Sequence, residues 1–166
     1  QQSPQWVVLT GDYVGRSAHA AEGLVEPLAA LDVPIYASYG NHDYWTDRPI
    51  VERHLKNAGA TVLLNQALPV ADRLWLAGVD DIWSGRPDLR AALRDVPGDA
   101  VTVLLAHEPD FFDQVIGADA PVALQLSGHS HGGQVRFPLL QPDEAGYYSY
   151  APVLPNYSHR YPIGLR

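Results

Sequence analysis

Short apolar runs alternate with helix-like stretches along this chain of 166 residues, and polar side chains recur just after the apolar runs end. Runs rich in β-branched and aromatic residues between turn residues indicate buried strands, whereas apolar positions at helical spacing indicate helices. Buried strands need helices to cover them, so the alternation predicts a layered α/β fold. The length fits one domain with its own core, and we expect residues 1–166 to form it.

The expected elements can be placed by residue range. The strand-like runs are residues 6–9, 34–39, 61–64, 68–70, 74–78, 101–106 and 122–126, with a return strand expected at 134–137. The helix-like stretches are residues 18–31, 50–58 and 87–94. Pro27 lies inside the first of these stretches and predicts a kink or a break there. After Pro138 the chain is rich in Pro, Tyr and Gly, which indicates irregular structure.

Four polar residues lie one to three positions after a predicted strand, where the loops of an α/β fold converge. They are Asp12, Asn41, His107 and His129. His131 follows two positions after the last of them, in a glycine-rich loop. A carboxylate, an amide oxygen and imidazoles, without any thiolate, suit manganese, iron, zinc or cobalt better than an all-oxygen calcium or magnesium site.

Each of these signals has a plainer explanation when it is taken alone. A Gly-Asp pair after a strand is typical of a turn, and a single histidine such as His107 is often a hydrogen-bonded polar residue. Tyr44 and Trp45 either line a pocket or are half-buried loop aromatics. Five such signals in one small domain favour a shared metal site over independent coincidence.

Taken in order, Gly11-Asp12, Gly40-Asn41-His42-Asp43, His107 and Gly128-His129-Ser130-His131 resemble the motif series of the calcineurin-like metallophosphoesterases. The resemblance spans residues 6–137 and is closest to a bacterial branch that contains membrane- and cell-wall-associated phosphodiesterases. It implies a layered α-β-β-α sandwich. It also implies metal-dependent hydrolysis of phosphoesters, as a phosphodiesterase or phosphatase, at a dinuclear centre with a bridging hydroxide as nucleophile.

The resemblance assigns ligands to two divalent ions of manganese, iron or zinc. Asp12 would bridge them, Asn41, His107 and His129 would complete the first site, and His131 would belong to the second. The family pattern also has an Asp-x-His motif before the Gly-Asp element, and residues 1–11 contain neither Asp nor His. We therefore expect the first site, with four ligands, to fill more readily than the second, which keeps two.

The same resemblance gives His42 a place over the scissile phosphate, as general acid or electrostatic stabiliser, with Asp43 orienting it. The missing motif predicts a fold that is truncated at its N-terminus, without the first strand of the family, and that is also short at its C-terminus. A lost strand would expose a sheet edge and favour self-association. Two other interpretations stay open: a catalytically impaired fold that binds one metal or none and acts as a scaffold, and a mononuclear metal-binding module with a protein partner.

The charge balance bears on partners. The formal net charge of −8 disfavours long nucleic acids, so we expect a small phosphoester substrate and leave lipid head groups, nucleotides and cell-wall phosphodiesters open. The sequence has no apolar run of about 18 residues, and we expect no transmembrane segment. The compartment is unknown: the bacterial cytoplasm and the periphery of the membrane or cell envelope both fit.

Overall fold

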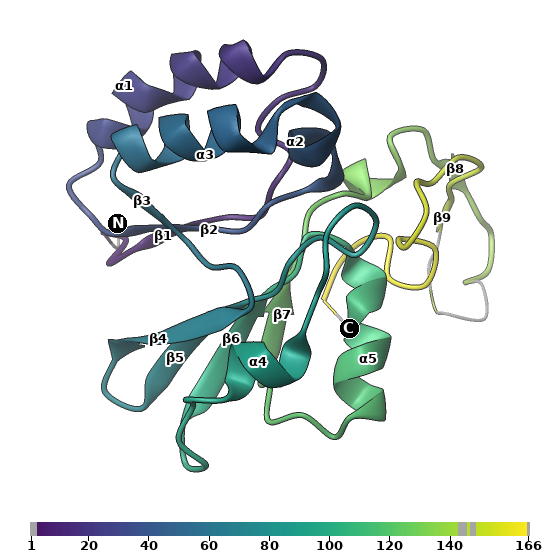
Figure 1. Cartoon of the computed structure of the whole chain (residues 1–166). Coiled ribbons are helices and arrows are strands. Elements are labelled where there is room, and N and C mark those ends of the chain that lie inside the picture. Colours follow the sequence, from purple (N-terminus) through teal and green to yellow (C-terminus); the bar gives the residue numbers. More distant parts are fainter. Residues whose placement is uncertain (1–2, 143–145, 147–148, 166) are drawn as a thin grey trace.

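The computed structural model describes residues 3–142, 146 and 149–165. Two sheets pack face to face in this part of the chain, and helices cover their outer faces (Figure 1). The first sheet has the order β1-β2-β3, and its strands are all parallel. Its members are β1 Val7–Leu9, β2 Ile35–Ala37 and β3 Ala60–Val62.

The second sheet has the order β4-β5-β6-β7. Its members are β4 Gln66–Ala71, β5 Leu74–Gly78, β6 Val101–Leu105 and β7 Leu124–Leu126. The strand β4 runs antiparallel to β5, whereas β5, β6 and β7 are parallel. The polar ends of parallel strands therefore gather along one edge of each sheet.

The return strand expected at residues 134–137 is wrong. The chain after β7 forms a 3-10 turn, η3 His131–Gly133, and Gln134 then takes a left-handed backbone with φ of 36°. That conformation cannot continue an extended strand. Pairing resumes in β8 Phe137–Pro138, and its partner is β9 Ser149–Tyr150 rather than β7.

Two groups of helices cover the sheets (Figure 1). The group on the first sheet comprises η1 Ala18–Leu24, α1 Val25–Ala29, α2 Asn41–Thr46 and α3 Arg48–Asn57. The group near the second sheet comprises α4 Leu89–Leu93, η2 Pro109–Phe111 and α5 Phe112–Gly117. This arrangement confirms the α-β-β-α layering that the family resemblance implies.

The helix expected at residues 18–31 changes type along its length. The 3-10 helix η1 passes directly into α1, and Leu24 and Val25 at the junction keep right-handed helical angles, so the chain does not break there. Pro27 occupies the first turn of α1. A backbone N–H in that turn has no intrahelical acceptor, and proline therefore costs little there. The helix expected at residues 50–58 is α3, and it begins before residue 50 because the Asp47 side chain accepts a hydrogen bond of 3.2 Å from the Ile50 amide.

Three apolar clusters fill the three spaces between the layers. The middle cluster joins the two sheets through Leu63, Leu76 and Leu105, with Val8 and Tyr36 packed against it. A second cluster lies under η1 and α3, and a third lies under α4 and α5. Because each layer is anchored by its own buried side chains, the strand ends are held in fixed positions.

The strand β1 ends the order of the first sheet in the described part of the chain, so its outer side is an edge there. Self-association through that edge stays a prediction. Within the described residues, each helix is too short or too polar to cross a membrane.

Candidate metal centre

The structure brings together the polar residues that follow β1, β2, β6 and β7. One ligand atom from each of Asp12, His107 and His129 lies within 4.8 Å of the other two. Asn41 begins α2 and lines the same pocket as Asp12 and His129. The two sheets thus contribute donors to one point, which sequence spacing alone does not show.

Two glycines allow the loops to approach this closely. A Cβ atom on Gly40 would overlap Asp12 Oδ1 and would lie 2.6 Å from His107 Cε1. At Gly11 it would lie 2.5 Å from the Gly40 nitrogen, and the φ of this residue is +92°. A side chain at either position would push the donors apart, which explains why glycine precedes both Asp12 and Asn41.

The two histidines are held by main-chain carbonyls that select their tautomers. Nδ1 of His107 lies 2.5 Å from the Thr10 carbonyl oxygen, and Nε2 of His129 lies 2.8 Å from that of Asn156. A carbonyl only accepts, so each of these nitrogens carries the proton. The other nitrogens, His107 Nε2 and His129 Nδ1, lie 3.1 Å apart and present lone pairs to the same point. Such outer contacts orient histidines for a metal ion.

Asn41 supplies the test of whether a metal ion fits. The residue is 1% exposed, and its Oδ1 atom is buried without a hydrogen-bond partner in the described part of the chain. An orphaned buried oxygen costs about 1–3 kcal/mol. Its neighbours are a carboxylate and two imidazoles, so the donor set suits a divalent transition metal, which would satisfy that oxygen.

The charges of the cluster are coupled. Burial opposes ionisation of Asp12, but the hydrogen bond and charge of His107 outweigh it and lower the pKa of this carboxyl. Burial likewise opposes the charged form of His107, yet Asp12 raises the pKa of that imidazole. For His129, burial dominates and lowers the pKa. The cluster therefore favours an ionised Asp12 and a neutral His129, both in the state that binds a metal.

Asp43 holds the loops together through three main-chain amides. Its Oδ2 accepts hydrogen bonds from the amides of Asp12 (3.0 Å) and Gly40 (2.9 Å), and its Oδ1 accepts one from Tyr13 (2.9 Å). Burial, the largest influence, raises the pKa of Asp43 to about 6 in spite of these donors. The carboxyl thus ties the end of β1 to the start of α2. The carboxyl therefore positions the segment that carries His42, and its orientation of the His42 ring stays a prediction.

His42 is positioned by two contacts of its own. Its main-chain amide donates to Asp12 Oδ1 at 2.9 Å, and Nδ1 of its ring lies 3.2 Å from the Gly15 carbonyl oxygen. That carbonyl selects the Nδ1–H tautomer and leaves Nε2 as the nitrogen that can exchange a proton. The side chain lines the pocket next to Asp12 and Asn41.

His131 lies apart from the cluster. It is exposed at the rim of the same pocket, and its Nδ1 contacts Gln134 Nε2 at 2.6 Å. Its φ of 51° is left-handed, as is that of His129 at 62°. Both histidines line the pocket, but only His129 is in the group of converging donors in the described part of the chain, which is compatible with ligands of different ions.

The pocket has a volume of about 340 Å³. Sequence patterns did not single out Trp83, Val153, Leu154 or Pro155, which form one side of it. Trp83 lies in the loop after β5, close to Asp80 and Asp81. Its position just beyond a predicted strand was the sequence feature that could have marked it as a pocket residue. Residues 153–155 come from the irregular C-terminal region, where no periodic signal exists.

The comparisons with known proteins agree with the geometry. A family model described as Calcineurin-like phosphoesterase matches residues 1–133. The chain is 34% identical over 151 residues to the metallophosphoesterase YkuE of Bacillus subtilis, covering 86% of this chain and 52% of the relative. It is 36% identical over 155 residues to the phosphodiesterase YaeI of Escherichia coli, covering 84% and 53%. A Bos taurus transmembrane protein with a metallophosphoesterase domain is 33% identical, covering 89% and 39%. The chain thus spans about half the length, or less, of these curated relatives.

Proposed function

The chain belongs to the calcineurin-like phosphoesterase family, and we propose that it hydrolyses small phosphodiesters with divalent metal ions. Asp12, Asn41, His107 and His129 would hold the first ion. The observation that carries the proposal is the buried, unpartnered Asn41 Oδ1 next to three converging donors. Folding leaves this oxygen without a partner in the described part of the chain, and a cation is the partner that the surrounding donors suit.

The proposal includes a second ion beside Asp12, for which His131 is the ligand that this chain offers. With fewer ligands, that position would bind more weakly than the first. Manganese, iron and zinc all suit the donor set. When bound, such ions stabilise charge on phosphoryl oxygens and make a water molecule nucleophilic at neutral pH.

His42 would donate a proton to the leaving oxygen through Nε2. The Gly15 carbonyl oxygen lies 3.2 Å from the other ring nitrogen, Nδ1, and this contact supports Nε2 as the atom that would donate the proton. The His42 main-chain amide donates a hydrogen bond to Asp12 Oδ1, which holds this residue beside the proposed first metal position. A proton donor at this place assists departure of an alkoxide or phenoxide.

The charge of the pocket favours diesters over monoesters. In the described part of the chain, the lining residues include Asp12 and three histidines but neither arginine nor lysine. A phosphomonoester carries nearly two negative charges at neutral pH, whereas a diester carries one. Apart from the proposed metal ions, no arginine or lysine of this lining would hold the second negative charge of a monoester, and this supports the diester as substrate.

The main test is hydrolysis of bis(p-nitrophenyl) phosphate with added Mn²⁺. We expect metal-dependent turnover, and a loss of about 100-fold or more in kcat/KM for Asn41→Ala and for His129→Ala, since each removes a ligand. His19→Ala is the matched control, because His19 is exposed on η1 away from the pocket. Equal rates in the parent and Asn41→Ala would overturn the proposal, and metal binding without turnover would favour the scaffold interpretation.

The role of His42 has its own test. His42→Ala should slow hydrolysis of diphenyl phosphate at least about tenfold more than that of bis(p-nitrophenyl) phosphate, because p-nitrophenolate needs less protonation to depart. The two esters have the same shape around phosphorus, so the comparison isolates the leaving group. Equal losses for both esters would remove His42 from proton transfer.

A further inference from the structure

Trp45 and Trp83 stand exposed at the rim of the candidate metal pocket. Their exposed fractions are 53% and 38%, large for indole side chains that contact each other with ring centroids 5.0 Å apart. Both line the same pocket as Asp12 and Asn41. Two exposed indoles bordering a polar site leave apolar surface in water where a ligand would sit.

Trp45 is placed there by the helix that carries Asn41. The two residues are four positions apart in α2, and His42 and Trp45 are three apart, so all three share a side of the helix. The rings of His42 and Trp45 lie 4.9 Å apart. The proton donor proposed above therefore has an indole as its neighbour.

The main chain of Trp83 is held by the buried carboxylate of Glu108. Glu108 is fully buried beside His107, and it accepts hydrogen bonds from the amides of Ile82 (3.1 Å) and Trp83 (3.3 Å). The indole lies 5.9 Å from the ring of His129 and 6.1 Å from that of Tyr157. The segment after β6 therefore supplies His107 as a candidate metal ligand and, through Glu108, also holds the backbone of Trp83.

The pocket thus has a polar side and an apolar side. The donors and His42 form the first, whereas Trp45 and Trp83, with residues 153–155, form the second. A phosphoester bound with its phosphoryl oxygens at the donors would place one ester group against the indoles.

We propose that Trp45 and Trp83 form a subsite for an apolar ester group of about the size of an aromatic ring, next to His42 on the leaving-group side. This inference rests on the proposed function, since it places the phosphoryl group at the metal donors. Burying such a group against two indoles gains affinity in proportion to the apolar area removed from water. Small hydrophilic ester groups would gain nothing from this surface.

Binding of two phosphonates to the Mn²⁺-loaded chain tests the subsite by calorimetry. Phenylphosphonate and methylphosphonate share the anionic head and differ in the apolar group, and neither has an ester bond to cleave. We expect phenylphosphonate to bind about tenfold more tightly. In Trp45→Ala and in Trp83→Ala that advantage should fall to about twofold or less, and Trp45→Phe should restore part of it.

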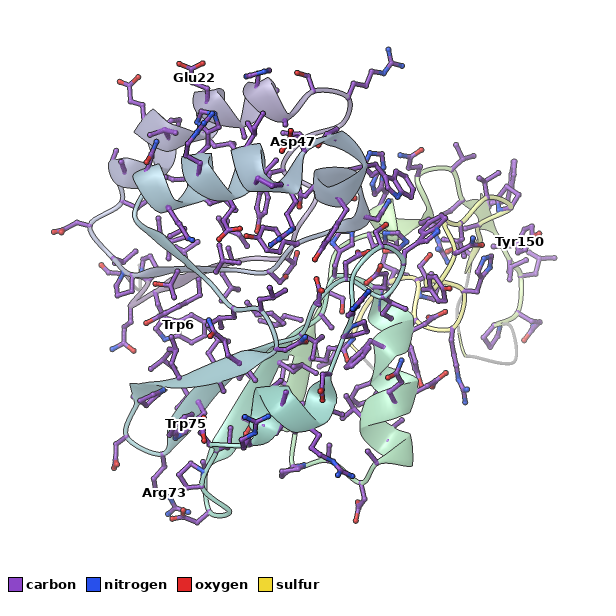
Figure 2. All side chains as sticks on the ribbon, viewed as in Figure 1. Trp6, Glu22, Asp47, Arg73, Trp75 and Tyr150 are labelled. Atoms are coloured by element: carbon purple, nitrogen blue, oxygen red, sulfur yellow. The ribbon has the colours of Figure 1, made fainter. Side chains whose placement is uncertain are left out.

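Trp6→Ala is the matched control. Trp6 precedes β1 at the end opposite to Asp12, and Figure 2 shows it on the side of the molecule away from Tyr150. The control should keep the full advantage of phenylphosphonate. Equal affinities of the two phosphonates in the parent, or an advantage that survives both Trp→Ala changes, would overturn the subsite.

These outcomes are separate from those for the proposed function. Selective phenylphosphonate binding without turnover of any diester would keep the subsite and overturn hydrolysis. Metal-dependent turnover with equal phosphonate affinities would keep hydrolysis and overturn the subsite. Calorimetry measures the heat of binding and not product formation. The two phosphonates therefore test the subsite even if the chain hydrolyses no diester.

Discussion

Asp12 and His107 face each other across 3.2 Å, from carboxylate Oδ2 to imidazole Nε2, with His107 only 1% exposed. Without a metal ion, a proton can occupy this gap. Burial opposes the charged form of each group, but their mutual attraction outweighs it: the pKa of Asp12 is lowered and the pKa of His107 is raised. Both shifts favour keeping the proton on His107. A divalent ion would use the same two atoms. Proton and metal therefore compete for one position.

Metal binding should consequently release a proton from His107. Below the raised pKa of His107, the apparent affinity for Mn²⁺ should rise about tenfold per pH unit and then level off as pH passes through that pKa. Calorimetric titrations in two buffers with different ionisation enthalpies measure the protons released. The same affinity and no proton release throughout pH 6–8 would contradict this competition.

Gly40→Ala should weaken metal binding. The added methyl would overlap Asp12 Oδ1, so the carboxylate or the loop must move. We expect Mn²⁺ affinity to fall by about tenfold or more, as when contacts that orient a ligand are lost. Gly98→Ala is the control, since a Cβ there meets no atom within 4 Å. If the two variants bind Mn²⁺ equally well, the close packing of the loops does not set the site.

Asp43→Ala should destabilise the chain far more than Asp47→Ala. Removing Asp43 leaves three main-chain amides without their acceptor, at a cost on the order of 3 kcal/mol or more in the free energy of unfolding. Asp47 caps α3 through the Ile50 amide in an exposed position, and its loss should cost about 1 kcal/mol. Urea denaturation of both variants measures the difference. Similar losses would show that the Asp43 contacts do not tie the loops together.

Asp81 should make the metal-free chain less stable as pH rises. Burial, followed by a hydrogen bond with Glu108, raises the pKa of Asp81 to about 8. The folded state then holds a proton that the unfolded state has lost, so stability falls between about pH 4 and 8. Asp81→Asn keeps a donor toward Glu108 without titrating, and it should flatten this decline by a few kcal/mol, on the order given by the shift. Urea denaturation at pH 5 and pH 8 checks it, and an unchanged difference between the two pH values would refute it.

Local patterns in the sequence were enough for most of the layers and for the identity of the donors. Strands were expected at residues 74–78 and 101–106, and the structure has β5 and β6 there. Short β-branched runs encode strands locally, and the polar residues after them are read directly from the chain. The helix α2 was not predicted, because the sequence Asn41-His42-Asp43 is also typical of a turn. In the structure the Asp43 side chain accepts a hydrogen bond from the Gly40 amide and so caps a helix there.

Only the tertiary structure determines which of the candidate metal ligands lie close together and which residues surround them. His107 and His129 are 22 positions apart in sequence, and the selection of their tautomers depends on carbonyls of Thr10 and Asn156 that no side-chain pattern reveals. His131 is two positions from His129 in sequence, yet it is not in the group of converging donors in the described part of the chain. The donors and the strands that carry them are thus encoded locally in the chain. Their convergence and the aromatic side of the pocket come from the packing of two sheets, because such contacts join residues far apart in sequence.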